Sequence, residues 1–337
     1  MTTIKNPVRV LAVDGGGSKT IAWIANVVSS NEQSPFQIDV VGRGASGPSN
    51  PRSVGFDSAF ANLNYAVDQA IEQSSVAATS IAVACLSVAG VGRIEEQSRM
   101  QAWAKERGLA KHTIVVNDVE PLRLAAMFER QSDHALPADA YNWEQSVTLV
   151  VGTGSIACGQ NGASRSTRAG GWGYLLGDQG SGFAMGLCGL QSICESYDRG
   201  DSISPFQTSL LNCLHLKEPT ELVGFLYKTP IPRVEVAELS EIIMAHADTD
   251  CLARQIRHES IESMASLVST TIQRLGLTHE SYSLALSGGI LTNHPVIVDQ
   301  LLSALQNQCL SPRIWQLVQQ PIHGPLWMAA QQVKMDC

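Results

Sequence analysis

The sequence predicts an α/β protein of two domains, each with a mixed sheet, that face each other across a central cleft. The chain has 337 residues, which is long for one hydrophobic core and comfortable for two. Short apolar strands alternate with segments of helical periodicity. A strand, a Gly-rich hairpin tip and a second strand occur twice, around residues 14–20 and 152–155, which indicates a duplicated architecture.

The N-terminal part reads as three strands followed by alternating helices and strands. Strands are expected at 8–13, 21–28, 38–42, 81–88 and 113–116, and helices at 57–73, 95–107 and from about 121. Residues 44–51 are rich in Gly and Pro, which predicts a loop. We expect a first domain over residues 1–120, completed by a C-terminal helix over 322–337.

The second domain, expected over residues 121–321, restarts the strand and hairpin pattern. Strands are expected at 147–151, 156–159, 282–286 and 314–318, and helices at 183–197, 236–247, 251–275 and 296–305. A last helix, from about 325, lies in the C-terminal segment that completes the first domain. A Gly-rich stretch over 168–182 precedes the first of these helices.

The first hairpin tip reads Asp14-Gly15-Gly16-Gly17-Ser18-Lys19-Thr20. Three consecutive glycines let backbone N–H groups converge on a phosphate, and the hydroxyls of Ser18 and Thr20 add donors. The next residues, 21–28, have the β-branched and aromatic content of a strand, so neither a Walker-A loop nor a Rossmann turn fits. The segment therefore predicts a phosphate loop with a Mg²⁺-binding carboxylate, Asp14; an ordinary Gly-rich hairpin turn is the alternative.

Asp118 follows Asn117 at the carboxyl end of a buried strand, where ligands gather in α/β sheets. A carboxylate there can accept the proton of an attacking hydroxyl during phosphoryl transfer. It can equally cap the helix that begins near Pro121, and the sequence leaves both roles open.

Three further Gly-rich segments are candidate ligand contacts. Residues 152–155 read as a second phosphate clamp or a plain hairpin turn, and 287–289 as a base- or ribose-binding turn or a simple connection. In 170–182, six glycines surround Trp172 and Asp178, which suggests close approach of backbone to a polar ring.

Composition limits the partners. A net charge of −8 argues against nucleic acid, and no apolar stretch reaches the length of a membrane span. The N-terminus lacks a signal-peptide pattern, and the eight scattered cysteines contain no C-x-x-C pair, so we expect cytoplasmic thiols. The His residues show no metal-ligand spacing.

These motifs, in this order and spacing, resemble the N-acetylglucosamine kinase and glucosamine kinase family, over residues of about 8 to 332. That family belongs to the actin-like superfamily of sugar kinases and shares a sequence domain with BadF/BadG/BcrA/BcrD-type activator ATPases. The resemblance implies two RNase-H-like domains, the cofactors ATP and Mg²⁺, and transfer to the 6-hydroxyl of an amino-sugar.

By position, the resemblance implies Asp14 as the Mg²⁺-linked carboxylate and Asp118 as the catalytic base, beside Asn117. The nucleotide is expected at these residues: Gly15, Gly16, Gly17, Ser18, Lys19, Thr20, Gly152, Thr153, Gly154, Gly288 and Gly289. The amino-sugar is expected at these: Asn50, Ser155, Gly171, Trp172 and Asp178. Vertebrate relatives carry a polar residue where Ile156 stands, so recognition of the sugar 2-substituent departs from the pattern.

The leading expectation is therefore a kinase that makes N-acetylglucosamine 6-phosphate. Glucosamine and N-acetylmuramic acid are alternative acceptors, and an activator ATPase of a partner reductase is an alternative activity. Such activators hold an iron–sulfur cluster with Cys, and no Cys lies in that context here. A sugar-sensing regulator is disfavoured because the first strand starts at Val8, without a preceding helix-turn-helix. The assembly is left open between a monomer and a homodimer.

Overall fold

The computed structural model describes residues 7–29, 36–75, 80–132, 143–162 and 165–335, and the chain divides into two compact units. Unit 1 consists of Met1–Trp143 and Val318–Cys337, and unit 2 of Glu144–Leu317. The helix after residue 120 packs in unit 1 against the C-terminal helix, so the chain passes into unit 2 only after Trp143.

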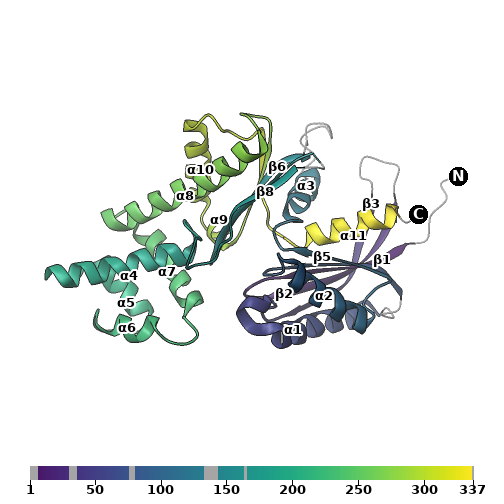
Figure 1. Cartoon of the computed structure of the whole chain (residues 1–337), viewed down its shortest axis with the longest axis horizontal. Coiled ribbons are helices and arrows are strands. Elements are labelled where there is room, and N and C mark those ends of the chain that lie inside the picture. The colour runs from purple at the N-terminus through teal and green to yellow at the C-terminus, as the bar shows by residue number, and fades with distance from the viewer. Residues whose placement is uncertain (1–6, 30–35, 76–79, 133–142, 163–164, 336–337) are drawn as a thin grey trace. The chain divides into compact units, whose positions relative to one another are not determined.

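Unit 1 is built on a five-stranded mixed sheet of order β3-β2-β1-β4-β5 (Figure 1). Its strands are β1 (Val8–Gly15), β2 (Thr20–Ser29), β3 (Phe36–Ser46), β4 (Ile81–Val88) and β5 (His112–Asn117). Its helices are α1 (Pro51–Ser74), α2 (Ile94–Arg107), α3 (Leu122–Ser132) and α11 (His323–Met335). β1 to β3 are antiparallel, whereas β4 and β5 run parallel to β1.

Alternation along β1 produces a core on each face of this sheet, because successive side chains of a strand point to opposite sides. Leu11 and Val13 lie in one cluster with residues of α1 and α2. Val10 and Ala12 lie in the other, with α3 and α11. The sheet is thus covered on both faces, and its ligand-binding region is left to the strand ends.

The β3 strand continues to Ser46, so the expected loop over 44–51 is correct only in its second half. A Cβ on Gly42 would lie 2.1 Å from the carbonyl oxygen of Ala70, and one on Gly44 1.9 Å from that of Ala66. Both carbonyls belong to α1. The glycines therefore let the helix pack directly on the strand and do not interrupt it.

Unit 2 has a second five-stranded mixed sheet, of order β10-β9-β6-β7-β8. Its strands are β6 (Gln145–Val151), β7 (Ser155–Asn161), β8 (Arg165–Gly170), β9 (Ser283–Ser287) and β10 (Ile314–Leu317). Its helices are α4 (Gly182–Arg199), α5 (Pro205–Cys213), α6 (Glu221–Leu226), α7 (Arg233–His246), α8 (Cys251–Leu275), α9 (Gly289–Asn293) and α10 (Pro295–Asn307). β8, α5, α6 and α9 are additions to the expected elements.

The two sheets have the same topology. Read from β8, the second sheet is an antiparallel β8-β7-β6 meander extended by β9 and β10, which run parallel to β6. The β3-β2-β1 meander with β4 and β5 repeats this arrangement. The duplicated α/β architecture predicted from the two hairpins is confirmed. No helix among the described residues combines the length and apolar character that a membrane span requires.

Candidate active site

Three parallel strands of unit 1 end beside one another at one edge of the sheet. Asp14 near the end of β1 pairs with Ser87 of β4, and Val88 pairs with Asn117 at the end of β5. Asp118 follows Asn117 directly. Since ligands of α/β sheets bind outside the carboxyl ends of such strands, Asp14 and Asp118 lie where chemistry is expected.

The tip between β1 and β2 is a closed loop whose backbone carbonyls point into the protein. Gly16 N donates to Lys19 O at 2.9 Å, and the Gly15 carbonyl accepts from Ala89 N at 2.7 Å. Gly17, Ser18 and Lys19 are exposed. Their N–H groups are available at the apex, which is the arrangement that a phosphate-binding nest needs.

Thr20 differs from the other loop residues because its side chain is buried. The Thr20 hydroxyl contacts the Gly47 carbonyl and the Ser49 hydroxyl. It is therefore engaged in the wall of the loop, and the hydroxyl at the apex is that of Ser18. Sequence reasoning missed Ser49, which lies in a Gly-Pro-Ser-Asn run interpreted only as irregular structure.

The two carboxyls have raised pKa values. Burial and then repulsion from Asp118 raise the pKa of Asp14 to about 7, and the ammonium of Lys19 opposes the shift. Burial also raises the pKa of Asp118 to about 6, although its own N–H and that of Val119 stabilise the charged form. Perturbed pairs of this kind concentrate at functional sites.

The helix-cap alternative for Asp118 finds no support in these contacts. The α3 helix begins at Leu122, after a turn over 118–121. The Asp118 carboxylate takes the N–H groups of Asp118 and Val119, which precede the helix.

Asn50 lies next to the phosphate loop. Its Oδ1 caps α1 by accepting from Arg52 N at 3.0 Å, and its backbone N donates to Gly16 O at 3.2 Å. A Cβ on Gly90 would lie 2.2 Å from that Oδ1, so the chain after β4 passes close to Asn50 only because residue 90 is Gly. Within unit 1, the structure thus brings together Asp14, the loop over 15–20, Asn50 and Asp118.

In unit 2, the second hairpin tip repeats the first. Gly152 N donates to Gly154 O at 2.9 Å, which closes the turn between β6 and β7. Gly182 N, in the first turn of α4, donates to Gly152 O at 2.8 Å. A Cβ on Gly152 would lie 3.9 Å from Gly289 N, so the expected adenosine-binding turn adjoins this tip.

Gly288 has a backbone that favours glycine. Its φ is +99°, and a Cβ would lie 2.3 Å from the Val151 carbonyl oxygen at the end of β6. Any side chain at 288 would push β9 away from β6 and displace the turn.

The Gly-rich stretch before α4 is held by Asp178, which is buried and has a φ of +61°. Its Oδ1 lies 3.4 Å from Ser155 N, and the Ser155 hydroxyl donates to Gln179 O at 2.8 Å. Burial raises the pKa of Asp178, while the Ser155 N–H and the charge of Arg233 oppose the rise. Arg233, stacked 4.6 Å over the Tyr174 ring, is a further polar residue of this region that the sequence did not single out.

Trp172 is 64% exposed, and the Arg168 guanidinium lies 4.9 Å from its ring centroid. A Cβ on Gly171 would lie 2.6 Å from Ile156 Cδ1. The structure thus gathers Ile156, Gly171 and Trp172 beside Ser155 within unit 2.

A divalent cation fits the carboxylates of unit 1. When ionised, the partly buried carboxylates of Asp14 and Asp118 bring together negative charge that a cation at Asp14 would compensate. No group of three or more His, Cys, Asp or Glu side chains in the described part of the chain forms a metal site of its own. A Mg²⁺ held there would take its other ligands from water and phosphate, as this ion commonly does.

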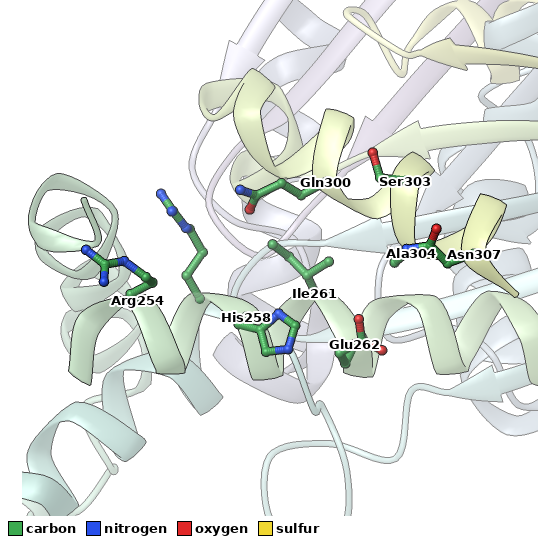
Figure 2. Close-up of a pocket in the computed structure, with 9 residues that line it drawn as sticks. Arg254, His258, Ile261, Glu262, Gln300, Ser303, Ala304 and Asn307 are labelled. Atoms are coloured by element: carbon green, nitrogen blue, oxygen red, sulfur yellow. The ribbon is translucent and has the colours of Figure 1, made fainter. Parts of the chain in front are cut away.

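A separate groove of about 390 Å³ runs between α8 and α10 (Figure 2). It contains none of the predicted site residues. Its two arginines already have partners: Arg257 Nη1 lies 3.1 Å from Asp248 Oδ1, and Arg254 Nη2 donates to the Asp248 carbonyl. Glu262 also lines the groove. We therefore assign the candidate site to the strand ends.

Two equivalent mixed sheets, each with a Gly-rich hairpin tip at the ends of its parallel strands, define the protein as an actin-like ATPase fold. A family model described as the BadF/BadG/BcrA/BcrD ATPase family matches residues 11–324, and the chain belongs to this family. The family predicted from the motifs is confirmed.

Two relatives match most of the chain. An N-acetylmuramic acid/N-acetylglucosamine kinase of Clostridium acetobutylicum is 26% identical over 292 residues, covering 86% of this chain and 88% of the relative. An N-acetyl-D-glucosamine kinase of Dictyostelium discoideum is 26% identical over 330 residues, covering 95% and 97%.

Solved structures share the fold at lower identity. A protein of Chromobacterium violaceum with the provisional name N-acetylglucosamine kinase has a TM-score of 0.69 at 18% identity, covering 96% of this chain and 99% of its own. A ROK hexokinase of Thermus thermophilus has a TM-score of 0.52 at 15% identity, covering 97% and 100%.

Proposed function

We propose that the protein is an ATP-dependent kinase that phosphorylates the 6-hydroxyl of an amino-sugar, with N-acetylglucosamine as its preferred acceptor. The observation that carries this proposal is the placement of Asp118 and Asp14, with the phosphate loop, at the same edge of the sheet, where β1 and β5 end on either side of β4. A base, a cation-binding carboxylate and phosphate donors are the parts that phosphoryl transfer requires. Both curated relatives are named as amino-sugar kinases, which supports the acceptor class.

In this proposal, Asp118 accepts the proton of the sugar hydroxyl as the new O–P bond forms and the bond to the leaving ADP breaks. With a pKa of about 6, the Asp118 carboxyl is largely ionised at neutral pH and still basic enough to take a proton. The N–H groups at the apex of the hairpin hold phosphate oxygens, and Asn50 orients the sugar beside them. Mg²⁺ at Asp14 would supply neutralisation of the charge on the transferred phosphoryl group.

In unit 2, we propose that the tip over 152–154 binds phosphate and that Gly288 and Gly289 form the adenosine turn. Ser155, Gly171, Trp172 and Asp178 are the proposed contacts of the amino-sugar ring. The contacts of Ser155, whose N lies 3.4 Å from Asp178 Oδ1 and whose hydroxyl donates to Gln179 O, support a common function for these residues. Ile156 gives the apolar side of this region, where an acetyl methyl group would fit better than a free amine.

The test is ADP release from Mg-ATP with N-acetylglucosamine, glucosamine, N-acetylmuramic acid, N-acetylmannosamine and glucose. Turnover on one amino-sugar well above the rate without sugar would establish the kinase and identify its acceptor. ATP hydrolysis that no sugar changes would contradict the proposal and favour the activator ATPase. In that case, anaerobically purified protein should contain a stoichiometric iron–sulfur cluster.

A further inference from the structure

Two loops of unit 1 are joined by a compact set of hydrogen bonds. One is the phosphate loop over 15–20, and the other is the segment over 47–50, which ends at the proposed sugar contact Asn50. Gly16 O accepts from Ser49 N at 3.1 Å and from Asn50 N at 3.2 Å. Both partners of one carbonyl thus come from the second segment, so the two loops cannot move independently without breaking these bonds.

Side chains reinforce the connection. Thr20 Oγ1 lies 2.7 Å from Gly47 O and 2.8 Å from Ser49 Oγ. A hydroxyl has one proton, and a carbonyl oxygen can only accept, so Thr20 donates to Gly47 O. The Ser49 hydroxyl must then donate to Thr20 Oγ1. The proton directions of this pair follow from the partners alone.

This pair is removed from solvent. Thr20 and Ser49 are each 0% exposed. A Cβ on Gly15 would lie 2.3 Å from Ser49 Oγ, so the first glycine of the phosphate loop leaves the space that the Ser49 hydroxyl occupies. Buried hydrogen-bonded hydroxyls of this kind fix geometry because water cannot replace either partner.

Asn50 links these hydrogen bonds to the proposed sugar site. Its Oδ1 is occupied by Arg52 N, whereas no partner is shown for its Nδ2 among the described residues. A sugar hydroxyl that accepts from Nδ2 would restrain residue 50, and with it the two N–H groups that hold Gly16 O. Ordering of one loop would then reduce the entropy lost when the other binds its ligand.

We propose that Ser49 is a positioning residue that couples occupation of the sugar loop to the phosphate loop. Sugar binding at Asn50 restrains the segment over 47–50. The hydrogen bond between Ser49 and Thr20 then restrains the start of β2, so the N–H groups at the apex of the phosphate loop are positioned to bind the γ-phosphate. This inference rests on the proposed kinase function and adds to it a residue that touches neither ligand.

The coupling is measured by binding, because linkage makes it reciprocal. The dissociation constant of the Mg²⁺ complex of β,γ-imido-ATP is determined by calorimetry without and with saturating N-acetylglucosamine. We expect sugar to tighten nucleotide binding of the wild type by about fivefold or more, within the usual range of such couplings. The ratio of the two dissociation constants, without and with sugar, is the coupling factor. In Ser49→Ala we expect the coupling factor to fall at least about threefold, whereas the affinities for nucleotide alone and for sugar alone should change less.

Ser46→Ala is the matched control. Ser46 is the last residue of β3, directly before the segment over 47–50, and its backbone pairs with Thr20, but its hydroxyl donates to Asn62 O of α1. This variant should keep the wild-type factor. Thr20→Val and Thr20→Ser form a second pair, because the first removes the hydroxyl that accepts from Ser49 and the second retains it. The factor should fall in Thr20→Val and be preserved in Thr20→Ser, which keeps the test decisive if Ser49→Ala does not fold.

The outcomes separate this inference from the proposed function. A wild-type factor near one, or an unchanged factor in Ser49→Ala and Thr20→Val, overturns the coupling role while sugar turnover upholds the kinase. A lowered melting temperature with an unchanged factor shows that Ser49 is merely structural. Absence of both sugar turnover and sugar binding in the wild type overturns the kinase and the coupling together.

Discussion

The carboxyls of Asp14, on β1, and Asp118, directly after β5, repel each other at the sheet edge where these two parallel strands end on either side of β4. After burial, this repulsion is the largest contribution to the raised pKa of Asp14, which is about 7. A protein without a ligand for these groups keeps such a pair only at a cost in stability, since buried like charges oppose folding. The pair therefore indicates a function that uses the charge.

The first prediction concerns stability against pH in the absence of divalent cations. Both carboxyls have folded pKa values above those of the unfolded chain, 3.8, so between about pH 4 and pH 7 the native state binds more protons than the unfolded state. Stability should therefore decrease as pH rises through this range, by several kcal/mol and at most about 7 kcal/mol in total, since one pKa unit corresponds to about 1.4 kcal/mol. Urea unfolding across the range measures it, with Asp14→Asn as the variant that should flatten the slope.

Added Mg²⁺ provides the complementary measurement. Binding requires an ionised carboxylate, so the cation should restore stability at about pH 8 and have little effect at about pH 5. Stabilisation by Mg²⁺ that is equal at both pH values, or unaltered in Asp14→Asn, would exclude Asp14 as the cation-binding group.

The second prediction concerns the proposed base. Asp118→Asn should lower kcat by on the order of 10²–10⁴ while the affinity for nucleotide stays nearly constant, because a positioned base acts only in the transition state. In the wild type, kcat/KM should fall as pH decreases through about 6, the pKa of Asp118. Steady-state kinetics across pH test both points. Normal turnover of the variant would leave Asp118 with a purely structural role.

The fold was predictable from residues whose local pattern agrees with their final environment. The strands on both sides of the first hairpin, β1 and β2, are apolar and β-branched, and they form as expected. The α8 helix has the predicted bounds, Cys251–Leu275. In these segments the spacing of apolar residues predicts the structure, because the buried side chains have the same spacing in the fold.

The sequence was less informative where tertiary contacts decide the structure. β8 reads Arg-Ser-Thr-Arg-Ala-Gly, which lacks an apolar alternation, because it is an edge strand in which only Ala169 is buried. Gly44 lies in a segment that was predicted as a loop, yet it is a strand residue because its missing side chain lets α1 pack directly on β3. Ser49 could not be found from sequence because its partner Thr20 is distant in the chain and only the fold brings the two hydroxyls together.

The third prediction uses the contact between α4 and α7. A Cβ on Gly186 would lie 1.9 Å from the Val236 carbonyl oxygen, so the helices approach closely only at a glycine. Gly186→Ala should destabilise the protein by about 2–4 kcal/mol through forced separation of the helices. Gly224→Ala is the control: this helical glycine has no atom within 4 Å of the added Cβ, so the variant should gain up to about 1 kcal/mol. Equal changes in both variants would contradict the packing argument.

The last prediction concerns Glu129, which holds the segment where the chain enters unit 1 for the second time. Its two carboxylate oxygens accept from Gln319 N at 2.9 Å and Gln320 N at 2.8 Å, and His323 Nδ1 lies 3.4 Å away. Burial alone would raise the pKa of Glu129, but these hydrogen bonds outweigh burial and lower it. Its contribution to stability is therefore present above the unfolded pKa and is lost as pH falls through the folded value.

Glu129→Gln replaces one accepting oxygen with an amide that faces an N–H donor. We expect a loss of about 1–3 kcal/mol at neutral pH, measured by urea unfolding, and a smaller difference from the wild type at acidic pH. Glu106→Gln, at an exposed position of α2, should change stability by less than about 0.5 kcal/mol. A deficit of Glu129→Gln that does not diminish at acidic pH would show that the carboxylate charge is not what secures residues 319 and 320.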